Sequence, residues 1–165
     1  MTPVDWPGLF DGYDVCDPKP GLNPEYVPLI DRLIAEPLND EERREIAERE
    51  LSDPATWQMP SKPLSESYLS FLAWSNGGLF IKDDREFAMF GAEELREYLI
   101  TYELPARCPN AVAFAADGLG GMYVFDLRLE AVNGEYPICH FAPDQFSFNE
   151  SDLVASSFPK LFAPA

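Results

Sequence analysis

A change in hydrophobic period between residues 64 and 90 is the feature that most constrains the fold of this chain. Apolar residues in the segment LSESYLSFLAWSNGG, Leu64 to Gly78, recur three and four positions apart, as in a helix with one buried face. Asn76, Gly77 and Gly78 end this helix, because glycine accepts the left-handed backbone of a C-terminal cap. The segments GLFI and EFAMF then alternate in character around the turn KDDR. The sequence therefore predicts a helix that leads into a β-hairpin.

One more helix and several strands are predicted in the C-terminal half. The segment GAEELREYLITYEL (91–104) has helical spacing, and the segments AVAFAA (111–116), MYVFDLR (122–128) and YPICHF (136–141) have the composition of strands. A short strand DLVA and a terminal helix SSFPKLF follow. This pattern predicts an α+β fold, with a mixed, mostly antiparallel sheet packed by helices. The candidate core residues are Tyr68, Phe71, Leu72, Phe114, Tyr123 and Phe125.

The N-terminal third has a different character. Residues 1–21 contain four prolines among glycines and aspartates, which predicts an irregular arm whose aromatic side chains lie against the body. Short helices are predicted over 25–36 and over the charge-rich segment 40–52, followed by a proline-containing connector. A chain of 165 residues can bury one substantial core. We therefore expect one compact unit, with a domain of residues 64–165 and an extension of residues 1–63 packed on it.

The acidity of the chain limits the partners that it can have. There are 29 acidic and 12 basic residues, and the net charge is -17. Such a chain repels nucleic acid and anionic membranes, and it suits a basic protein partner, although solubility alone also explains acidic composition. No basic and apolar leader opens the sequence, and no run approaches the roughly 18 apolar residues of a membrane span, so we expect a cytoplasmic protein.

The residues that could carry chemistry form no convincing catalytic or metal site. His140 is the single histidine, and it adjoins Cys139 in a predicted strand, where neighbours point to opposite faces. An ordinary strand histidine is favoured over a nucleophilic pair, and three scattered cysteines predict neither disulfides nor a metal site. The segment DGLGG (117–121) leads into a strand, so a hairpin loop is favoured over a phosphate loop. Asp117 and Asp126 could form a hydrolase carboxylate pair, but 29 acids offer such pairs by chance. We expect no cofactor and no metal.

Several motifs in order resemble the SMI1/KNR4 family, also called the SUKH superfamily. They are the helix that ends in Asn76-Gly77-Gly78, Asp117-Gly118, the strand end Phe125-Asp126, and the terminal Ser157-Phe158 helix. The resemblance runs from about Leu64 to Phe162. It implies a sheet packed by helices, in proteins that mostly serve as immunity proteins and neutralise a cognate toxin, often a nuclease. Fungal relatives are regulatory interaction scaffolds, and neither role implies catalysis.

Together, the charge and the resemblance predict a non-catalytic binding protein for a basic toxin. A regulatory scaffold of the fungal type is the alternative, and a hydrolase is a distant third. Between Ala111 and Glu150 there are six acidic residues and one basic residue, Arg128, so the C-terminal sheet region is a candidate negative face. The acidic residues that we nominate for steering the partner lie at or near predicted turns and strand ends: Asp83, Asp84, Asp117, Asp126, Glu135 and Asp144.

Overall fold

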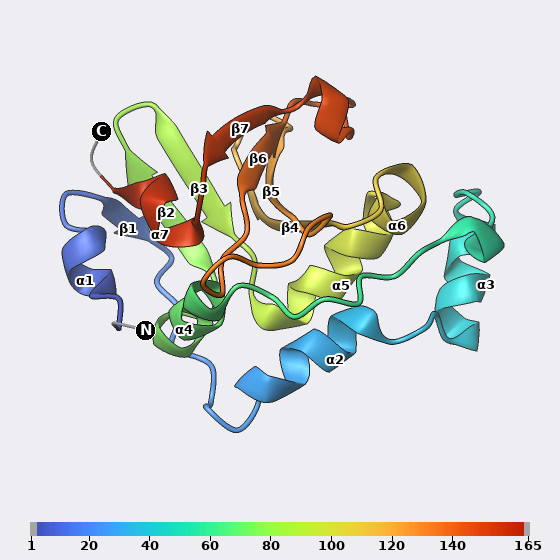
Figure 1. The fold of residues 1–165 in the computed structure, drawn as a ribbon, viewed down its shortest axis with the longest axis horizontal. Coiled ribbons are helices and arrows are strands. Elements are labelled where there is room, and N and C mark those ends of the chain that lie inside the picture. Colours follow the sequence, from blue (N-terminus) through green and yellow to red (C-terminus); the bar gives the residue numbers. More distant parts are fainter. Residues whose placement is uncertain (1–2, 164–165) are drawn as a thin grey trace.

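In a computed structural model, which describes residues 3–163, the chain forms one seven-stranded sheet with helices around it (Figure 1). Every pairing is antiparallel, and the order of the strands in the sheet is their order in the sequence. The strands are β1 (Asp14–Cys16), β2 (Gly78–Lys82), β3 (Arg85–Met89), β4 (Ala111–Ala116), β5 (Met122–Asp126), β6 (Ile138–Phe141) and β7 (Asp152–Ala155). The predicted α+β class is confirmed.

The helices are short, and most follow a polar residue at the N-cap position. Their bounds are α1 (Trp6–Leu9), α2 (Ile30–Ala35), α3 (Asp40–Glu48), α4 (Glu66–Trp74), α5 (Ala92–Thr101), α6 (Leu104–Arg107) and α7 (Phe158–Phe162). Single 3-10 turns occur at Val27–Leu29, Pro54–Thr56 and Phe148–Glu150. No helix among residues 3–163 is long and apolar enough to cross a membrane.

The helix that ends in two glycines forms as predicted. Ser65 accepts a hydrogen bond from the N–H of Tyr68 and caps the start of α4. Gly77 and Gly78 have φ values of +96° and +118°, and a Cβ atom on Gly77 would come within 3.0 Å of the backbone at Gly91. Only glycine fits there without strain. The turn therefore brings the end of α4 against the start of α5.

The core of the molecule lies mainly between the sheet and the helices α1, α4 and α7. Phe125 is fully buried in this layer, with its ring 5.1 Å from Tyr68 and 5.9 Å from Phe158. Its neighbour Val124 is also fully buried, so β5 is covered on both faces. The helix α5 packs along β4. Of the predicted core residues, Tyr123 is only partly buried, and the other five are fully buried.

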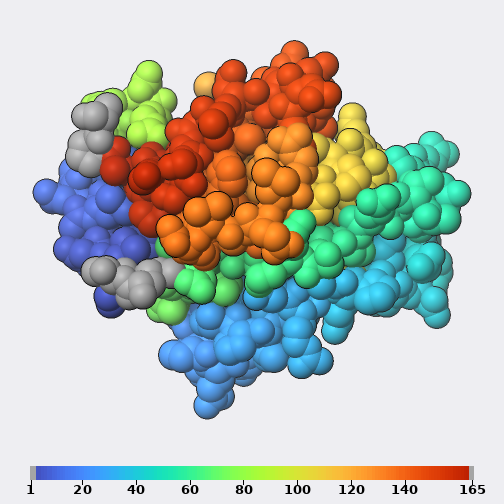
Figure 2. Space-filling model, viewed as in Figure 1, coloured from blue at the N-terminus to red at the C-terminus, as the bar shows by residue number. Residues whose placement is uncertain are grey.

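The N-terminal arm differs from the prediction, because it is not irregular throughout. It contains α1, capped by Asp5, and the strand β1, which pairs with β2 and extends the sheet. The arm packs against the other end of the chain, as Figure 2 shows by the blue residues beside the red ones. The hydroxyl of Tyr13 donates to the carbonyl of Phe162 (3.3 Å), and the ring of Trp6 lies 5.6 Å from that of Phe158. Residues 1–2 of the predicted arm lie outside the described range.

Candidate partner-binding site

Three of the six nominated acidic residues lie exposed in turns. Asp83 and Asp84 form the two-residue turn between β2 and β3. Asp144 lies in the loop after β6, where its backbone is left-handed (φ 62°). Exposed carboxylates can act on a partner through the field that they create, even without direct contact. The other three nominated residues make specific contacts within the chain.

Asp117 organises the loop between β4 and β5. Its Oδ1 accepts hydrogen bonds from the N–H groups of Leu119 (2.7 Å) and Gly121 (2.9 Å), and its Oδ2 lies 2.7 Å from Nε2 of His140. Burial raises the pKa of Asp117, but the bonds from His140 and the two amides outweigh it, so the pKa lies below its ordinary value. The segment DGLGG is thus a hairpin loop held by its first residue.

The histidine and cysteine side chains do not form a nucleophilic pair. The ring of His140 contacts Asp117 and Tyr123, whose ring centroid is 5.1 Å away, whereas Cys139 is buried. Burial raises the pKa of both Cys108 and Cys139, which disfavours the reactive thiolate form. Within residues 3–163, the structure contains no cluster of three or more His, Cys, Asp or Glu residues that could hold a metal ion.

Asp126 lies at the opposite end of the β4–β5 pair from Asp117. Asp126 is paired with Ala111, the first residue of β4, whereas Asp117 follows Ala116, the last. Asp117 is six residues from Ala111 along the chain, with one β-bulge between them, so at about 3.3 Å per residue the two strand positions are roughly 16 to 20 Å apart. A glycoside hydrolase needs its two carboxyl groups about 5 to 10 Å apart. The carboxylate of Asp126 instead accepts two hydrogen bonds from the guanidinium of Arg128 (2.9 and 2.8 Å). These two acids therefore cannot form the pair that the hydrolase hypothesis required.

Glu135 joins the N-terminal ends of two helices. Its carboxylate accepts hydrogen bonds from the hydroxyls of Ser65 (2.8 Å) and Ser67 (2.7 Å), and from the N–H groups of Ser67 (3.1 Å) and Phe158 (3.3 Å). An anion is favourable where helix N–H groups converge. Glu135 therefore stabilises the N-terminal ends of α4 and α7. Its role as a steering charge remains a prediction.

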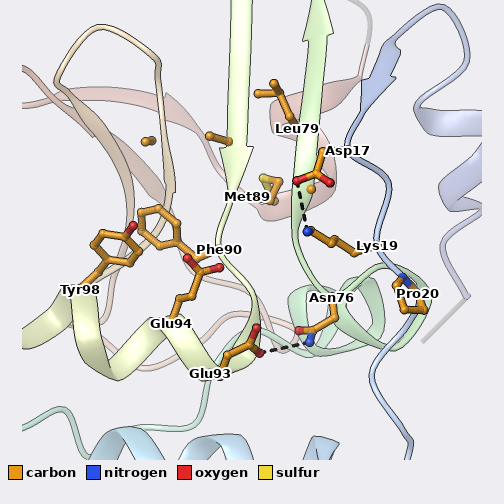
Figure 3. Close-up of a pocket in the computed structure, with 13 residues that line it drawn as sticks. Asp17, Lys19, Pro20, Asn76, Leu79, Met89, Phe90, Glu93, Glu94 and Tyr98 are labelled. Carbon is orange, nitrogen blue, oxygen red and sulfur yellow. Dashed lines mark hydrogen bonds and ion pairs between the residues drawn. The ribbon is translucent and has the colours of Figure 1, made fainter.

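A cleft of about 480 Å³ lies beside the start of α5 (Figure 3). Its floor includes Leu79, Ala88 and Ala116, which are register neighbours on β2, β3 and β4 and are partly exposed. One wall carries Phe90 and Tyr98, whose rings stack with centroids 4.1 Å apart. A volume of this size lies within the range of roughly 300 to 1,000 Å³ that is usual for ligand pockets.

Charged side chains from three segments form the rim of this cleft. Asp17 and Lys19 follow β1 and pair with each other at 3.1 Å. Asn76 donates a hydrogen bond to Glu93 (3.2 Å), which shares the first turn of α5 with Glu94. We call this hollow the acidic cleft, because three carboxylates and one cation line it: Asp17, Glu93, Glu94 and Lys19.

The acidic character continues around α5. A second hollow of about 300 Å³ lies between α3 and α5, and Glu93 lines both hollows. Two of its carboxylates are paired with arginines, Glu42 with Arg96 and Glu45 with Arg49. The remaining acidic side chains in its lining are Glu93 and Glu97. The two hollows therefore share Glu93, and both are lined by acidic side chains of α5.

Sequence reasoning did not nominate the acidic cleft. Glu93 and Glu94 lie in the predicted helix 91–104, and Asp17 lies in the predicted irregular arm, so the pattern gives no reason to bring them together. The useful signal was the Asn-Gly-Gly turn, since the side chain of Asn76 accepts a hydrogen bond from the N–H of Ala92 (2.8 Å) and joins the two helices. That contact spans the whole β2–β3 hairpin, so local sequence patterns do not predict it.

Comparison with known proteins agrees with this fold. No curated protein matches the chain. The model of the SMI1 / KNR4 family (SUKH-1) matches residues 54–163, about two thirds of the 165 residues. This range includes the strands β2 to β7 and the helices α4 to α7, and β1 lies outside it. The chain therefore belongs to the SMI1/KNR4 family (SUKH-1).

Proposed function

We propose that the protein is a non-catalytic binding protein that neutralises a basic toxin, such as a nuclease. The observation that carries the proposal is the net charge of -17 on a chain of the SMI1/KNR4 family. We also propose that it acts in the cytoplasm and uses neither nucleic acid nor a membrane as a partner. Within it, residues 64–165 would form the family domain, and residues 1–63 would form an extension packed on that domain.

The physical basis of the proposal is charge complementarity. A nuclease must be basic enough to hold a phosphate backbone, so an acidic protein can cover the surface that the nucleic acid would use. Opposite charge also steers the encounter and can raise the association rate to about 10^8 per molar per second at low salt. The exposed residues Asp83, Asp84 and Asp144 can contribute to this field without loss of internal contacts. The nominated Asp117, Asp126 and Glu135 would contribute from positions that also stabilise the fold.

The test uses the toxin encoded beside the gene. Co-expression should protect cells from that toxin, and stopped-flow mixing should give an association rate that falls steeply between about 0.05 and 0.5 M salt. Neutralising Asp83, Asp84 and Asp144 should lower the rate and weaken its salt dependence while the melting temperature stays unchanged. Failure to protect against any neighbouring toxin would refute the proposal. Salt-independent association would refute the steering mechanism alone.

A further inference from the structure

The last strand of the sheet leaves its outer edge unpaired. β7 (Asp152–Ala155) ends the strand order, and within residues 3–163 no hydrogen bond joins its backbone to an element other than β6 (Figure 1). Two aliphatic side chains of this strand are exposed to solvent, Leu153 by 70% and Val154 by 41%. Unpaired N–H and C=O groups at a strand edge are a template for another strand. The outer edge of β7 is therefore a candidate docking surface.

The opposite edge of the sheet is less suited to pairing. Its strand β1 has three residues, and Asp17, which follows it, has a left-handed backbone (φ 55°). Pro18 and Pro20 come soon after, and proline has no N–H group to donate. Very short strands, prolines and lysines are common protections of a sheet edge. β7 contains neither proline nor lysine.

Exposed apolar surface continues beyond the C-terminal end of β7. Ser156 and Ser157, which follow the strand, line a groove of about 520 Å³. Leu129 and Val132 line the same groove and are 79% and 72% exposed. Exposed apolar surface that gathers in one place is typical of protein interaction sites. A segment paired with β7 would therefore have apolar surface to cover near the end of the strand as well as along it.

The charges around this edge are mainly negative. Three exposed carboxylates lie in the strand, just before it or in the groove: Asp152, Glu150 and Glu130. Lys160 also lines the groove, and Arg128 is already paired with Asp126 (2.8 Å). A negative charge at a strand edge disfavours an acidic strand opposite it and favours a basic one. A second copy of this chain, with its net charge of -17, is therefore a poor occupant, whereas a basic segment is complementary.

The register of β7 also indicates the pattern of the occupant. Asp152 pairs with His140, and Leu153 pairs with Cys139. Neighbouring residues of a strand point to opposite faces, so the carboxylate of Asp152 and the side chain of Leu153 lie on opposite faces of the sheet. A strand added beside them meets a negative charge on one face and an aliphatic group on the other. Alternating basic and apolar side chains match this arrangement.

We propose that an extended segment of the basic partner protein, in which basic and apolar side chains alternate, adds to β7 as a further strand. Its backbone bonds to the free edge, its apolar side chains cover Leu153, and its cations lie near Asp152. This inference rests on the proposed function, and it names the way in which the partner is held after the encounter.

The added strand forms one part of a larger interface. A register shift opposite Ile138 and Cys139 leaves Val154 as an extra residue in β7. A bulge of this kind interrupts a regular ladder, so the paired stretch is short. Stable protein interfaces bury roughly 800 Å² on each partner, which is more than a few strand residues supply.

The probe is the peptide acetyl-Lys-Val-Lys-Val-Lys-Val-Lys-amide, titrated into the full-length protein at low salt and followed by 15N NMR. The signals of Leu153 and Val154 should shift, and the outward amide protons of β7 should exchange with solvent more slowly. A peptide with proline in place of the central valine keeps the charge but cannot pair as a strand. A peptide with glutamate in place of lysine reverses the charge. Absence of these changes with the basic peptide, or equal changes with either control, would overturn the proposal.

Two variants of the protein form a matched pair. Leu153→Lys and Leu119→Lys each place one lysine at an exposed leucine, 70% and 83% exposed, and Leu119 lies outside both β7 and the groove. A lysine on the edge should hinder an incoming strand and repel its cations. Leu153→Lys should weaken binding of the basic peptide about fivefold, and Leu119→Lys less than about twofold, with the melting temperature unchanged in both. Equal weakening by both variants would overturn the proposal.

Analytical ultracentrifugation tests the other occupant of the edge. The wild type should be monomeric at the concentration used for NMR. A dimer that Leu153→Lys dissociates would assign the edge to a second copy and would overturn the proposal.

The peptide results are independent of toxin protection. If the basic peptide binds at β7 but no neighbouring toxin is neutralised, the proposed function fails and the docking edge stands. If protection is intact and Leu153→Lys leaves the affinity for the toxin unchanged, this inference fails and the proposed function stands.

Discussion

At the scale of single residues, the hydroxyl of Tyr68 is the most unusual group in the core. Tyr68 is fully buried, and its hydroxyl has no hydrogen-bond partner within residues 3–163. Burial, together with the charges of Glu94 and Glu93, raises its pKa above the ordinary value, so the group stays neutral. Tyr68→Phe should therefore leave the free energy of unfolding unchanged or raise it by about 1 kcal/mol, measured by urea denaturation. A clear decrease in the free energy of unfolding would mean that the hydroxyl does make a hydrogen bond.

Phe125 illustrates how much one buried ring contributes. It is fully buried, 4.4 Å from the ring of Phe114 and 5.1 Å from that of Tyr68. Phe125→Ala should lower the free energy of unfolding by about 3 to 5 kcal/mol, since it removes these contacts and leaves a cavity. Leu129, which is 79% exposed, is the control, and Leu129→Ala should change the value by less than about 0.5 kcal/mol. An unfolding midpoint for Phe125→Ala equal to that of the wild type would contradict the packing.

Residue roles were harder to predict than burial. Phe125 could be assigned to the core because it lies in a short apolar run bounded by turn signals, which is a local pattern. Glu135 could not be recognised as a helix cap, because its partners Ser65 and Ser67 lie 70 and 68 positions away in the sequence. Asp117 was placed correctly in a loop, yet its bond to His140 depends on the register of β5 with β6. Contacts of this kind come from the assembled fold.

At the scale of elements, Arg96 connects α5 with α2 and α3. Its guanidinium donates to the carbonyls of Leu33 (2.6 Å) and Glu36 (2.9 Å), and it binds both carboxylate oxygens of Glu42 (2.7 and 2.8 Å). Arg96→Gln should lower the free energy of unfolding by about 1 to 3 kcal/mol at pH 7. Arg49→Gln, which removes an exposed 3.6 Å pair, should cost less than about 0.5 kcal/mol.

The Arg96 contacts also predict a pH dependence. The hydrogen bond from Arg96 lowers the pKa of Glu42, although burial opposes this. An unfolded glutamate has a pKa of about 4.3, so the pair contributes its full stability above that pH and loses it as the pH falls through the lower folded value. The stability gap between wild type and Arg96→Gln should therefore shrink between pH 7 and pH 3, measured by urea denaturation. An equal gap at both values would mean that Glu42 is not the partner that matters.

Most elements were predictable, including the short β7 and α7, but α1, β1 and α6 were not. The helices α4 and α5 and the strands β2 to β6 were placed within a few residues, because each shows a repeated apolar pattern. The elements α1, β1 and α6 have three or four residues each, too few for a period. The strand β1 forms because β2 offers it an edge, and Cys16 pairs with Leu79 across a long stretch of sequence. Tertiary context decides such elements.

At the scale of the whole molecule, self-repulsion is a cost that salt can reduce. Twelve basic side chains cannot neutralise 29 acidic ones, so most carboxylates have no basic partner and repel one another at low ionic strength. The melting temperature should rise by a few degrees between about 0.02 and 0.5 M NaCl, followed by circular dichroism. Guanidinium chloride is unsuited to this comparison, because it is itself a salt. A melting temperature that falls with NaCl would show that attractive ion pairs dominate the native state.

The packing of the arm on α7 has a consequence for the kinetics of the molecule. From β2 to β7 each strand pairs with the next, so these contacts close short loops and should form early. Phe10 meets Phe162 (4.7 Å) and Phe80 (4.6 Å) only when distant parts of the chain come together, which predicts that the arm docks after the rate-limiting step. Phe10→Leu should then speed unfolding about tenfold and change the refolding rate less than twofold in stopped-flow experiments. A slower refolding rate would mean that the arm is already docked in the transition state for folding. If the arm does dock last, it also leaves first, and the lifetime of the native state against proteases is governed by the arm and not by the sheet that it covers.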